Sequence, residues 1–343
     1  MRDDQARPDG ACVEHAVRRW GATAFAFDVL QNPEQYAMFA SRAVPDAIVP
    51  YRRVGRTDVV VGEALAPHER MADVVAEFVA DRRAAGRRVL GFLASEAFAR
   101  AIIAQGGGAA QLTAEPEIDP ATYEPSGGSA KKLRAYVRRL RRAGIDACEL
   151  PRMRTAPAEL QRSVQALTHE WIARGTARRA HFLEVDAWKR LEEKRLFAVF
   201  DPKDSDRLLA LLIAHPVYAE NGWHLCHLIR SPDAPKGVNE LTVMSAIERL
   251  ADEGVRYATF GPFAVPQAGE FLGFSRPMER FIRKGYELAS TVGGYAGSVE
   301  FYRKVNAGPW LPRYMAFSPR NVVLRPFLAT MRLTHVLGFL RRD

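Results

Sequence analysis

The sequence predicts an α/β protein built from two similar units, each with a mixed, largely antiparallel sheet flanked by helices. Its 343 residues are about two domains' worth, at roughly 100 to 200 residues each. An apolar content of 48% can fill two cores. Helix-like and strand-like patterns alternate along the chain, and a polar segment at 116–129 divides them.

The first unit is expected to span residues 1–122. Helical periodicity occurs near 12–20 and 67–85, and strand-like apolar runs occur at 24–27, 46–49, 58–61 and 89–93. The three glycines at 106–108 and the Pro, Gly and Ser of 116–129 are typical of a connector. We therefore place the boundary between the units near 120–128.

The second unit is expected to span residues 129–320 and to begin with a strongly basic helix. A strand is predicted near 146–150 and helices near 157–173 and 186–193. Three apolar strands follow, at 196–201, 208–215 and 223–229. Because the turns between them are short and polar, adjacent strands are expected to pair antiparallel.

A helix at 238–251, a strand at 257–260 and helices near 276–288 and 298–305 complete this unit. Antiparallel strands that lead into a strand, an anion-binding loop and a helix are the order of a GNAT-type acyltransferase core. Two such units in tandem fill the length of the chain.

The charge balance favours polyanionic partners. Forty-nine Lys and Arg against 40 Asp and Glu give a net charge of +9. Such an excess is typical of proteins that meet nucleic acid, anionic lipid or phosphorylated substrates. The alternative is an Arg-rich composition whose charges are merely solvated.

The cysteines and the apolar segments predict a reduced, cytoplasmic protein. Cys12, Cys148 and Cys226 are odd in number and lie far apart, without the short spacing of a zinc or redox motif. The start of the chain lacks the apolar run of a signal peptide, and no stretch of about 18 apolar residues could cross a bilayer.

The segment from Cys226 to Glu240 predicts an anion site. An apolar strand ends at Arg230, and a loop with Pro235 and Gly237 leads to a helix N-terminus. The first N–H groups of a helix lack partners, and its dipole favours negative charge. Arg230 is thus a candidate ligand for a phosphate, carboxylate or oxyanion. The alternative is that it pairs with Asp233 or Glu240.

His227 is a candidate base, because an unperturbed imidazole titrates near pH 6.5. Strand alternation predicts that it lies on the face opposite His224 and Cys226. A satisfied core or surface histidine is the favoured interpretation. Since only His224 and Cys226 would share a face, a complete metal-ligand set is not expected.

The helix predicted at 131–142 carries a cationic surface. Leu133, Tyr136, Val137 and Leu140 form its apolar stripe, and seven basic side chains occupy the other faces. Such a helix can follow the phosphates of an acceptor-stem RNA or of anionic headgroups. The alternative is a solvated helix face.

The segment 321–343 is predicted to be a basic amphipathic helix, with Pro326 in its first turn. Apolar and arginine side chains alternate in it so that it could lie in the headgroup plane of a bilayer. Equally, it could pack onto its own domain or onto a second subunit.

Motifs of other chemistries are absent. There is no Walker loop, no G-x-S-x-G elbow and no H-E-x-x-H, and the glycines at 106–108 lack the dinucleotide fingerprint. The pyrophosphate loop of acetyl-CoA users is also missing, because the segment after Arg230 is longer and carries two prolines.

Three motifs resemble the C-terminal synthase domain of the phosphatidylglycerol lysyltransferase family. The Lys-x-Leu-Arg helix start of that family resembles Lys131, Lys132, Leu133 and Arg134. Its Pro-Asp-Ala-Pro-x-Gly-Val loop resembles residues 232–238, and its closing aromatic, Lys and Trp-x-Pro-Arg-Tyr run resembles Tyr302, Arg303 and 310–314.

Departures from the family pattern are also present. The acid of the family's Asp-Leu-Met-Arg strand end is replaced by His227 when the strand is aligned on Arg230. The family's Glu ahead of the closing run aligns with Gly297, and its second Lys aligns with Val305. The large transmembrane half of well-known members has no counterpart here.

The resemblance implies a tandem GNAT-type enzyme that moves an amino acid from aminoacyl-tRNA to a hydroxyl or amine, as on a phospholipid. Such transfer needs a held ester, a base and a stabilised oxyanion. The expected catalytic residues are Arg230, His227, Glu240 and Arg313. The expected substrate-binding residues are Lys131, Lys132, Arg134, Pro235, Gly237, Tyr302, Arg303 and Tyr314.

The resemblance also implies partners and alternatives. The expected partners are tRNA and an anionic phospholipid or membrane surface, reached peripherally, with no DNA, no cofactor and no metal. One alternative is a CoA-dependent acyltransferase acting on a small polar substrate. Another is a non-catalytic relative that binds RNA or membrane.

Overall fold

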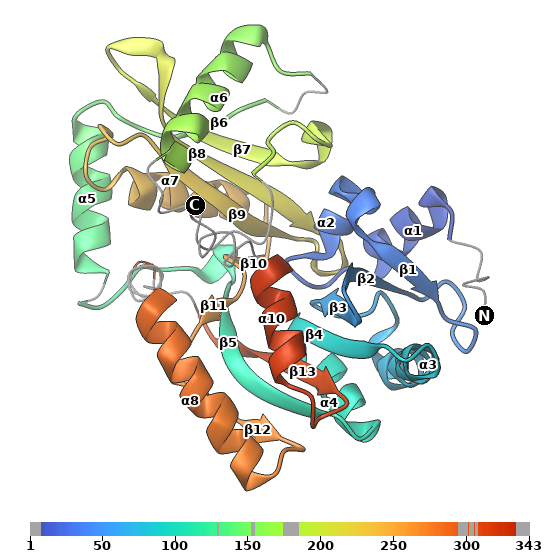
Figure 1. Ribbon diagram of the computed structural model, residues 1–343. Coiled ribbons are helices and arrows are strands. Elements are labelled where there is room, and N and C mark those ends of the chain that lie inside the picture. Colours follow the sequence, from blue (N-terminus) through green and yellow to red (C-terminus); the bar gives the residue numbers. More distant parts are fainter. Residues whose placement is uncertain are drawn as a thin grey trace.

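A single mixed sheet organises the computed structural model (Figure 1). The structure describes residues 8–128, 130–151, 155–173, 185–265, 267–293, 301, 305 and 308–333. Within them, 13 strands form one sheet with the path β1-β2-β3-β4-β13-β5-β10-β9-β8-β7-β6, and β11 and β12 pair with β5. Strands β1 to β5 with β13 form one half of this sheet, and strands β6 to β10 form the other.

The first half of the sheet is formed by the N-terminal strands. These strands are β1 (Ala37–Ala40), β2 (Ile48–Val54), β3 (Thr57–Val61), β4 (Arg88–Ala94) and β5 (Gly108–Ile118). The N-terminal helices are α1 (Gly10–Trp20), α2 (Ala26–Gln31), α3 (Met71–Ala84) and α4 (Glu96–Ala104). Strands β3 and β4 run parallel, as a crossover through α3 requires.

The second half is formed by strands that follow the connector. These strands are β6 (Cys148–Glu149), β7 (Arg195–Asp201), β8 (Asp204–Val217), β9 (Gly222–Arg230) and β10 (Ala258–Thr259). The helices are α5 (Lys131–Arg142), α6 (Ala158–Ala173) and α7 (Val238–Asp252). Strands β7, β8 and β9 pair antiparallel in sequence, which confirms the predicted hairpins.

The remaining elements return the chain to the first half. They are β11 (Phe263–Ala264), β12 (Phe271–Leu272), α8 (Arg276–Gly293), β13 (Trp310–Ser318) and α10 (Leu324–Leu333). Strand β13 inserts between β4 and β5 and is antiparallel to both. The sequence division places 310–318 with the second unit, but in space this strand completes the sheet of the first.

Strand β5 joins the two halves because it is long enough to serve both. Its residues from Gly108 to Pro116 pair with β13, and Glu117 and Ile118 pair with β10. Strand β10 is short, and it pairs parallel with β9 only at Trp223 and His224. Beyond that point β9 and β5 have no β10 residue between them, so a fork opens between the two halves.

Helices cover both faces of the sheet. In the second half, α5 and α7 pack on one face and α6 packs on the other, matching the alternation of buried residues along β7 and β8. In the first half, α3 and α4 cover one face. Ile282 of α8, Val323 and Phe327 pack against the other.

The C-terminal segment packs on its own chain as far as it is described. Phe327 of α10 lies against the core of the first half, whereas Leu324 and Leu328 are exposed. Of the two expectations for 321–343, self-packing therefore holds for the described turns, and residues 334–343 lie outside the described residues. In the part of the chain that the structure covers, no helix has the length and apolarity to span a bilayer.

Two expected elements differ from the structure, and some observed elements were not expected. The run 24–27 is not a strand but leads into α2, because a short apolar run cannot by its periodicity be told from a buried helix. The helix expected at 186–193 is only one 3₁₀ turn, Leu191–Glu193. Strands β1 and β5 and helix α4 were not predicted, since part of β5 was interpreted as connector.

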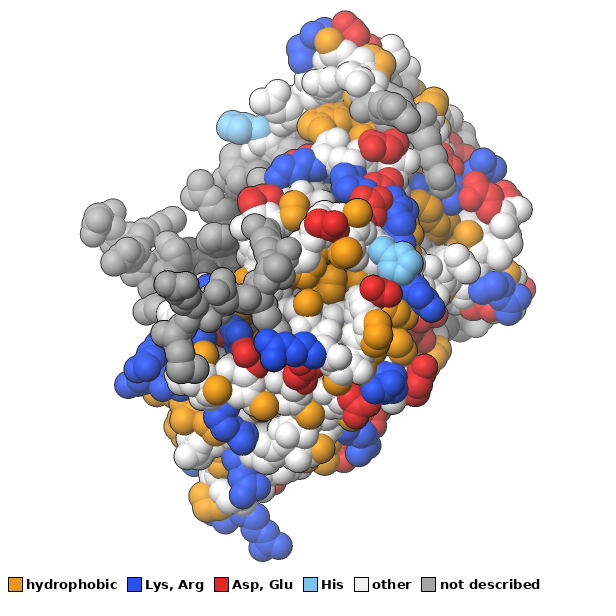
Figure 2. All heavy atoms as spheres, turned by 90° about the vertical axis from the view of Figure 1, so that its right-hand side faces the viewer, with side chains coloured by type: hydrophobic (Ala, Val, Ile, Leu, Met, Phe, Trp, Pro, Cys, Tyr) orange, Lys and Arg blue, Asp and Glu red, His pale blue; other side chains and the backbone are white. Residues whose placement is uncertain are grey.

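The excess of basic side chains is not gathered on the surface of the first half that Figure 2 shows. Figure 2 shows acidic and basic side chains interspersed with small apolar patches over this face. Helix α5 differs, because Lys131, Lys132, Arg138 and Arg139 are all exposed on it. The cationic surface that the sequence predicts therefore lies on the second half.

Candidate functional site

The predicted anion loop forms where β9 ends and α7 begins. Gly237 is the N-cap of α7 and has a φ of 97°, a left-handed conformation that favours glycine. A Cβ at this position would lie 2.4 Å from the Cβ of Tyr136 on α5. Glycine is thus required twice here, for the turn and for the close approach of the two helices.

Helix α5 is held to this loop by its own basic residues. The guanidinium of Arg139 lies 5.4 Å from the ring centroid of Tyr136 and donates to the Lys236 carbonyl at 2.5 Å. Arg134 donates to the carbonyls of Pro125 and Gly127. Arg134 therefore fixes the connector in place, a structural role that does not need a ligand.

Lys131 and Lys132 are exposed at the first turn of α5. That turn contains no acidic residue. Cations at a helix N-terminus oppose the dipole and cost about 0.3–1 kcal/mol each, unless an anion sits among them. This end of α5 is thus electrostatically prepared for a phosphate.

Arg230 lies exposed at the end of β9, and Glu240 is part-buried in the first turn of α7. Asp233, one of the partners considered for Arg230, instead accepts from Arg207 at 3.2 Å. Pro235 is part-buried in the loop. The loop thus follows Arg230 on the second half of the sheet and contacts α5 at Tyr136 and Arg139.

Arg313 lies elsewhere, in β13, and is buried with 7% of its surface exposed. Its Nε donates to Glu115 Oε2 of β5 at 2.6 Å. Strands β5 and β10 lie between β13 and β9 in the sheet. Arg313 is therefore committed to a buried ion pair and does not share the surroundings of Arg230.

A cluster of acidic residues surrounds this ion pair, and we call Glu63, Glu115, Glu117 and Arg313 the junction cluster. Glu115 Oε1 also accepts from the Thr259 hydroxyl of β10 at 2.8 Å. The cluster thus lies where the two halves of the sheet meet. Glu115 pairs with the guanidinium, and Glu63 and Glu117 interact with both groups electrostatically.

The electrostatics of the junction cluster follow from this imbalance. Burial raises the pKa of the Glu63 carboxyl and nearby Glu115 adds to the rise, whereas Ser95, Arg313 and His68 oppose it. Burial and Glu115 likewise raise the pKa of Glu117, with Arg313 opposing. One arginine does not neutralise the site, so a further cation would be favourable there.

The pH dependence of Glu63 gives a testable prediction. Because its folded-state pKa is raised, its contribution to stability is fully present below the ordinary glutamate value of about 4.3 and is lost as the pH rises through the folded-state pKa. Glu63→Gln, which stays neutral, is therefore expected to increase the free energy of unfolding near about pH 8. Urea unfolding should show no such gain below about pH 4.

The matched control for this experiment is Glu34→Gln, which removes an exposed carboxylate. It is expected to leave the free energy of unfolding nearly unchanged at both pH values. A Glu63→Gln protein less stable than the wild type near about pH 8 would contradict the assigned imbalance.

Of the residues predicted at the closing motif of the sequence, those that the structure describes do not lie beside the loop. Tyr314 is buried, its hydroxyl donates to Glu270 Oε2 at 3.3 Å, and burial raises its pKa to about 12. Tyr302 and Arg303 lie outside the described residues. The structure therefore brings together the loop and α5, and places Arg313 and Tyr314 in a separate, buried region.

The face predicted for His227 is wrong. The pairing of β8 with β9 shifts between Ile213 and Ala214, which face His227 and Leu225, so Cys226 is the extra residue of a β-bulge. A bulge breaks strict alternation. The ligand atoms of His215, Cys226 and His227 consequently lie within 4.8 Å of one another.

A groove of about 690 Å³ runs between α5 and α7. Leu133, Val137, Met244, Ile247 and Ala251 give it an apolar floor. Its side is lined by Arg138 and Arg142, by Arg134, which holds the connector, and by Arg141, which pairs with Glu248 of the groove at 2.5 Å. At one end lie Pro120 and Tyr123, just after β5. An apolar floor with an arginine rim is complementary to an anionic amphiphile.

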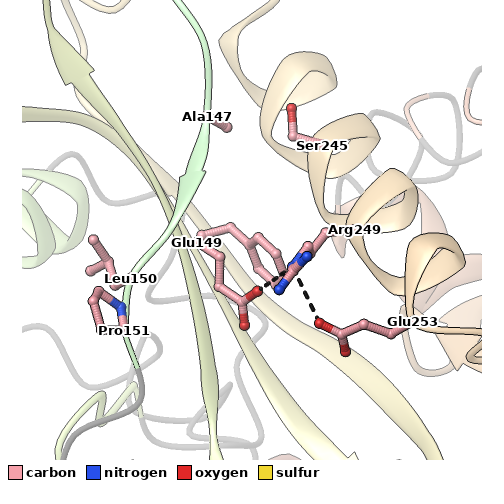
Figure 3. Close-up of a pocket in the computed structure, with 8 residues that line it drawn as sticks. Ala147, Glu149, Leu150, Pro151, Ser245, Arg249 and Glu253 are labelled. Atoms are coloured by element: carbon pink, nitrogen blue, oxygen red, sulfur yellow. Dashed lines mark hydrogen bonds and ion pairs between the residues drawn. The ribbon is translucent and has the colours of Figure 1, made fainter.

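A second pocket, of about 540 Å³, opens between β6 and α7 (Figure 3). Glu149 of β6 and Glu253 of α7 both flank Arg249, and both also bind the buried Arg195. Its charges are thus paired with one another. We assign this pocket a structural role.

Sequence reasoning missed the acids of the junction cluster. Glu115 and Glu117 recur at a spacing of two in the run 108–118, a signal of one strand face. The neighbouring Pro116 and the glycines favoured a connector instead. Glu63 directly follows β3 and Gly62, and nothing in its local sequence marks it.

Fold and site together define a class: two acyltransferase-like α/β units joined through one sheet, with a charged cluster at their junction. The family model described as "Phosphatidylglycerol lysyltransferase, C-terminal" matches residues 16–317. Because this match covers most of the sequence, the chain belongs to that family, which is named for an enzyme. The resemblance seen in its motifs is confirmed.

Curated relatives carry the name lysylphosphatidylglycerol biosynthesis bifunctional protein LysX. The protein of Mycolicibacterium vanbaalenii is 26% identical over 262 residues, which is 69% of this chain and 21% of that protein. The protein of Mycobacterium sp. (strain JLS) is 25% identical, over 73% of this chain and 23% of that protein. The chain therefore spans about a fifth of the length of these relatives.

Solved structures share the fold along nearly the whole chain. The structure of L-PGS from Bacillus licheniformis has a TM-score of 0.76 at 18% identity and covers 99% of this chain and 100% of that one. The C-terminal domain of a lysylphosphatidylglycerol synthetase from Agrobacterium fabrum has a TM-score of 0.72 at 19% identity, covering 96% and 98%. The predicted fold class is thereby confirmed.

Proposed function

We propose that this chain transfers a positively charged aminoacyl group, of the lysyl type, from aminoacyl-tRNA to a hydroxyl of phosphatidylglycerol. Family membership supports transfer to this lipid. We infer the positive charge of the transferred group from the junction cluster. No cofactor is required, because the donor ester is already activated.

The junction cluster supports an ammonium ligand through its unbalanced charge. Arg313 engages Glu115, which leaves Glu63 and Glu117 as carboxylates whose charged forms are disfavoured by burial and by Glu115. An ammonium group between them would favour their ionisation. A neutral aminoacyl group would leave that repulsion in place.

Glu63 is also our candidate general base. A carboxylate with a raised pKa is a better proton acceptor near neutral pH than an ordinary one. In the proposed step the acceptor hydroxyl oxygen attacks the aminoacyl carbonyl, and the ester bond to the tRNA ribose breaks. The hydroxyl proton passes through the base to the leaving ribose oxygen.

The cationic surfaces are proposed to hold the two anionic substrates. The groove between α5 and α7 fits the lipid, because its floor suits acyl chains and its arginines suit the phosphate. The exposed start of α5, with Lys131 and Lys132, fits the phosphates of tRNA. Arg230 and the N–H groups after Gly237 would extend this anion surface.

The test uses the full chain, tRNA charged with labelled lysine, and vesicles that contain phosphatidylglycerol. We expect label in the lipid extract and loss of transfer after ribonuclease treatment. Transfer should fall with Glu63→Gln and persist with the exposed control Glu34→Gln. If label reaches the lipid equally well from alanyl-tRNA, the transferred group need not be positively charged. If the chain instead transfers an acyl group from acyl-CoA with release of the thiol, the donor is acyl-CoA and not aminoacyl-tRNA.

A second pair of variants tests the tRNA surface. Lys131→Glu reverses a charge at the start of α5, where a carboxylate favours the helix dipole, so lost transfer cannot come from helix instability. It should weaken tRNA binding and flatten its salt dependence. Lys203→Glu, an equally exposed lysine in the turn between β7 and β8, is the matched control. Equal effects of both variants would contradict a localised site.

A further inference from the structure

The bulge in β9 creates a cluster of soft metal ligands that nothing in the proposed reaction uses. Cys226 and His227 are consecutive, and His215 reaches them from the neighbouring strand β8. One ligand atom from each lies within 4.8 Å of the other two. The His215 and His227 rings meet edge to face, with centroids 5.9 Å apart.

The burial of these histidines requires an explanation. His215 is 2% exposed and His227 is 1% exposed. Neither ring nitrogen of His215 has a hydrogen-bond partner among the described residues. A buried polar group left in this way costs about 1–3 kcal/mol, and an unseen ion is one recognised reason for it.

His224 shows the contrast on the same strand. It is also buried, but its Nδ1 lies 2.8 Å from the Ala24 carbonyl and so has a partner. Its ring is 6.2 Å from that of His215. Among the described residues, the His224 imidazole thus has a hydrogen-bond partner, whereas the nitrogens of His215 have none and one ligand atom of this ring lies near a thiol and a second imidazole.

We propose that His215, Cys226 and His227 form a binding site for a divalent transition metal ion of the Zn²⁺ class. Two imidazoles and one thiolate are a donor set that zinc favours, and three protein ligands leave a fourth position for water or another group. Tetrahedral ligands at about 2.0–2.3 Å from zinc are roughly 3.3–3.7 Å apart. Small side-chain rotations would close the present separations.

The charges around the cluster are nearly balanced. The nearby Lys194 amine donates to the Asp186 carbonyl at 2.6 Å, and burial lowers its pKa to about 8. The Asp28 carboxylate interacts electrostatically with Cys226 and pairs with Arg52 at 2.7 Å. A thiolate and a divalent metal ion would add one net positive charge to this region.

Cobalt titration tests the site directly. The chain is prepared without an affinity tag and with Cys12→Ser and Cys148→Ser, both exposed, so that Cys226 is the sole thiol of the sequence. Stoichiometric Co²⁺ should give visible d–d bands and a near-ultraviolet thiolate charge-transfer band, and Zn²⁺ should displace it. Metal analysis should find one equivalent per chain.

Variants complete the experiment. Cys226→Ser should abolish the charge-transfer band, and His215→Gln or His227→Gln should weaken Co²⁺ binding by roughly tenfold or more. His169→Gln, an exposed histidine of α6, is the control and should bind normally. A variant with a substitution at a buried position could misfold, so a further measurement uses the parent chain. Zn²⁺ should protect Cys226 from thiol reagents, and this protection should be lost when a chelator removes the metal. If the folded parent chain shows neither the thiolate charge-transfer band with Co²⁺ nor protection of Cys226 by Zn²⁺, the proposal is wrong.

Discussion

Arg313→Met is expected to lower the free energy of unfolding by about 3–5 kcal/mol, the largest single effect among the variants considered. The substitution leaves Glu115 buried, with 1% of its side chain exposed, and without the guanidinium that lies 2.6 Å away. Among the described residues, the Thr259 hydroxyl would then be the remaining hydrogen-bond partner of that carboxylate. Urea unfolding of the full chain measures the loss, and transfer activity should fall with it.

Two comparisons isolate the cause. The double variant Arg313→Met with Glu115→Gln removes both charges and should be less destabilised than the sum of the single variants. Arg162→Met breaks an exposed pair with Glu159, where both side chains are more than two-thirds exposed (69% and 67%), and should leave the free energy of unfolding nearly unchanged. Equal losses from Arg313→Met and Arg162→Met would show that the buried pair does not hold the junction.

Gly237→Ala is expected to cost about 2–4 kcal/mol and to separate α5 from α7. The left-handed conformation penalises any Cβ, and this Cβ would also meet Tyr136 at 2.4 Å. Since α5 carries the cationic surface and one wall of the groove, tRNA binding and lipid transfer should both decline. Denaturant unfolding and the labelled transfer assay measure the two consequences.

Gly254→Ala is the matched control at the other end of α7. Gly254 has a φ of 73°, and a Cβ added to it would meet no neighbouring atom of the described residues within 4 Å. The variant therefore carries the conformational penalty without the clash and should lose about 1–2 kcal/mol. The loss from Gly237→Ala should be smaller in a Tyr136→Gly background, because that substitution removes the Cβ of Tyr136 that lies 2.4 Å from the added methyl group. If the two glycine variants lose the same amount, the contact with Tyr136 is unimportant.

The second half of the fold was largely predictable from sequence. Strands β7, β8 and β9 and helix α7 combine strong periodicity with clear polar turns, and each prediction falls within a few residues of the structure. The loop at Gly237 was also predictable, because its turn chemistry is local. Local signals suffice where neighbours in sequence are also neighbours in space.

The first half and the junction were not predictable in this way. Strand β5 contains proline and follows glycines, so its local sequence favoured a connector, and tertiary pairing overrides that preference. The bulge at Cys226 likewise depends on the register of β8 against β9. A register is fixed only when both strands and their packing are present.

The sequence by itself determined the α/β class, the order of elements in the second half, the cationic helix α5 and the family motifs. Only the tertiary structure decided that β13 lies beside β5, which brings Arg313 to Glu115 across 198 positions of the chain. No local pattern encodes such a contact, because the two side chains share an environment only after the sheet has closed around them. The charge of the junction, and with it the proposed substrate, follows from that closure.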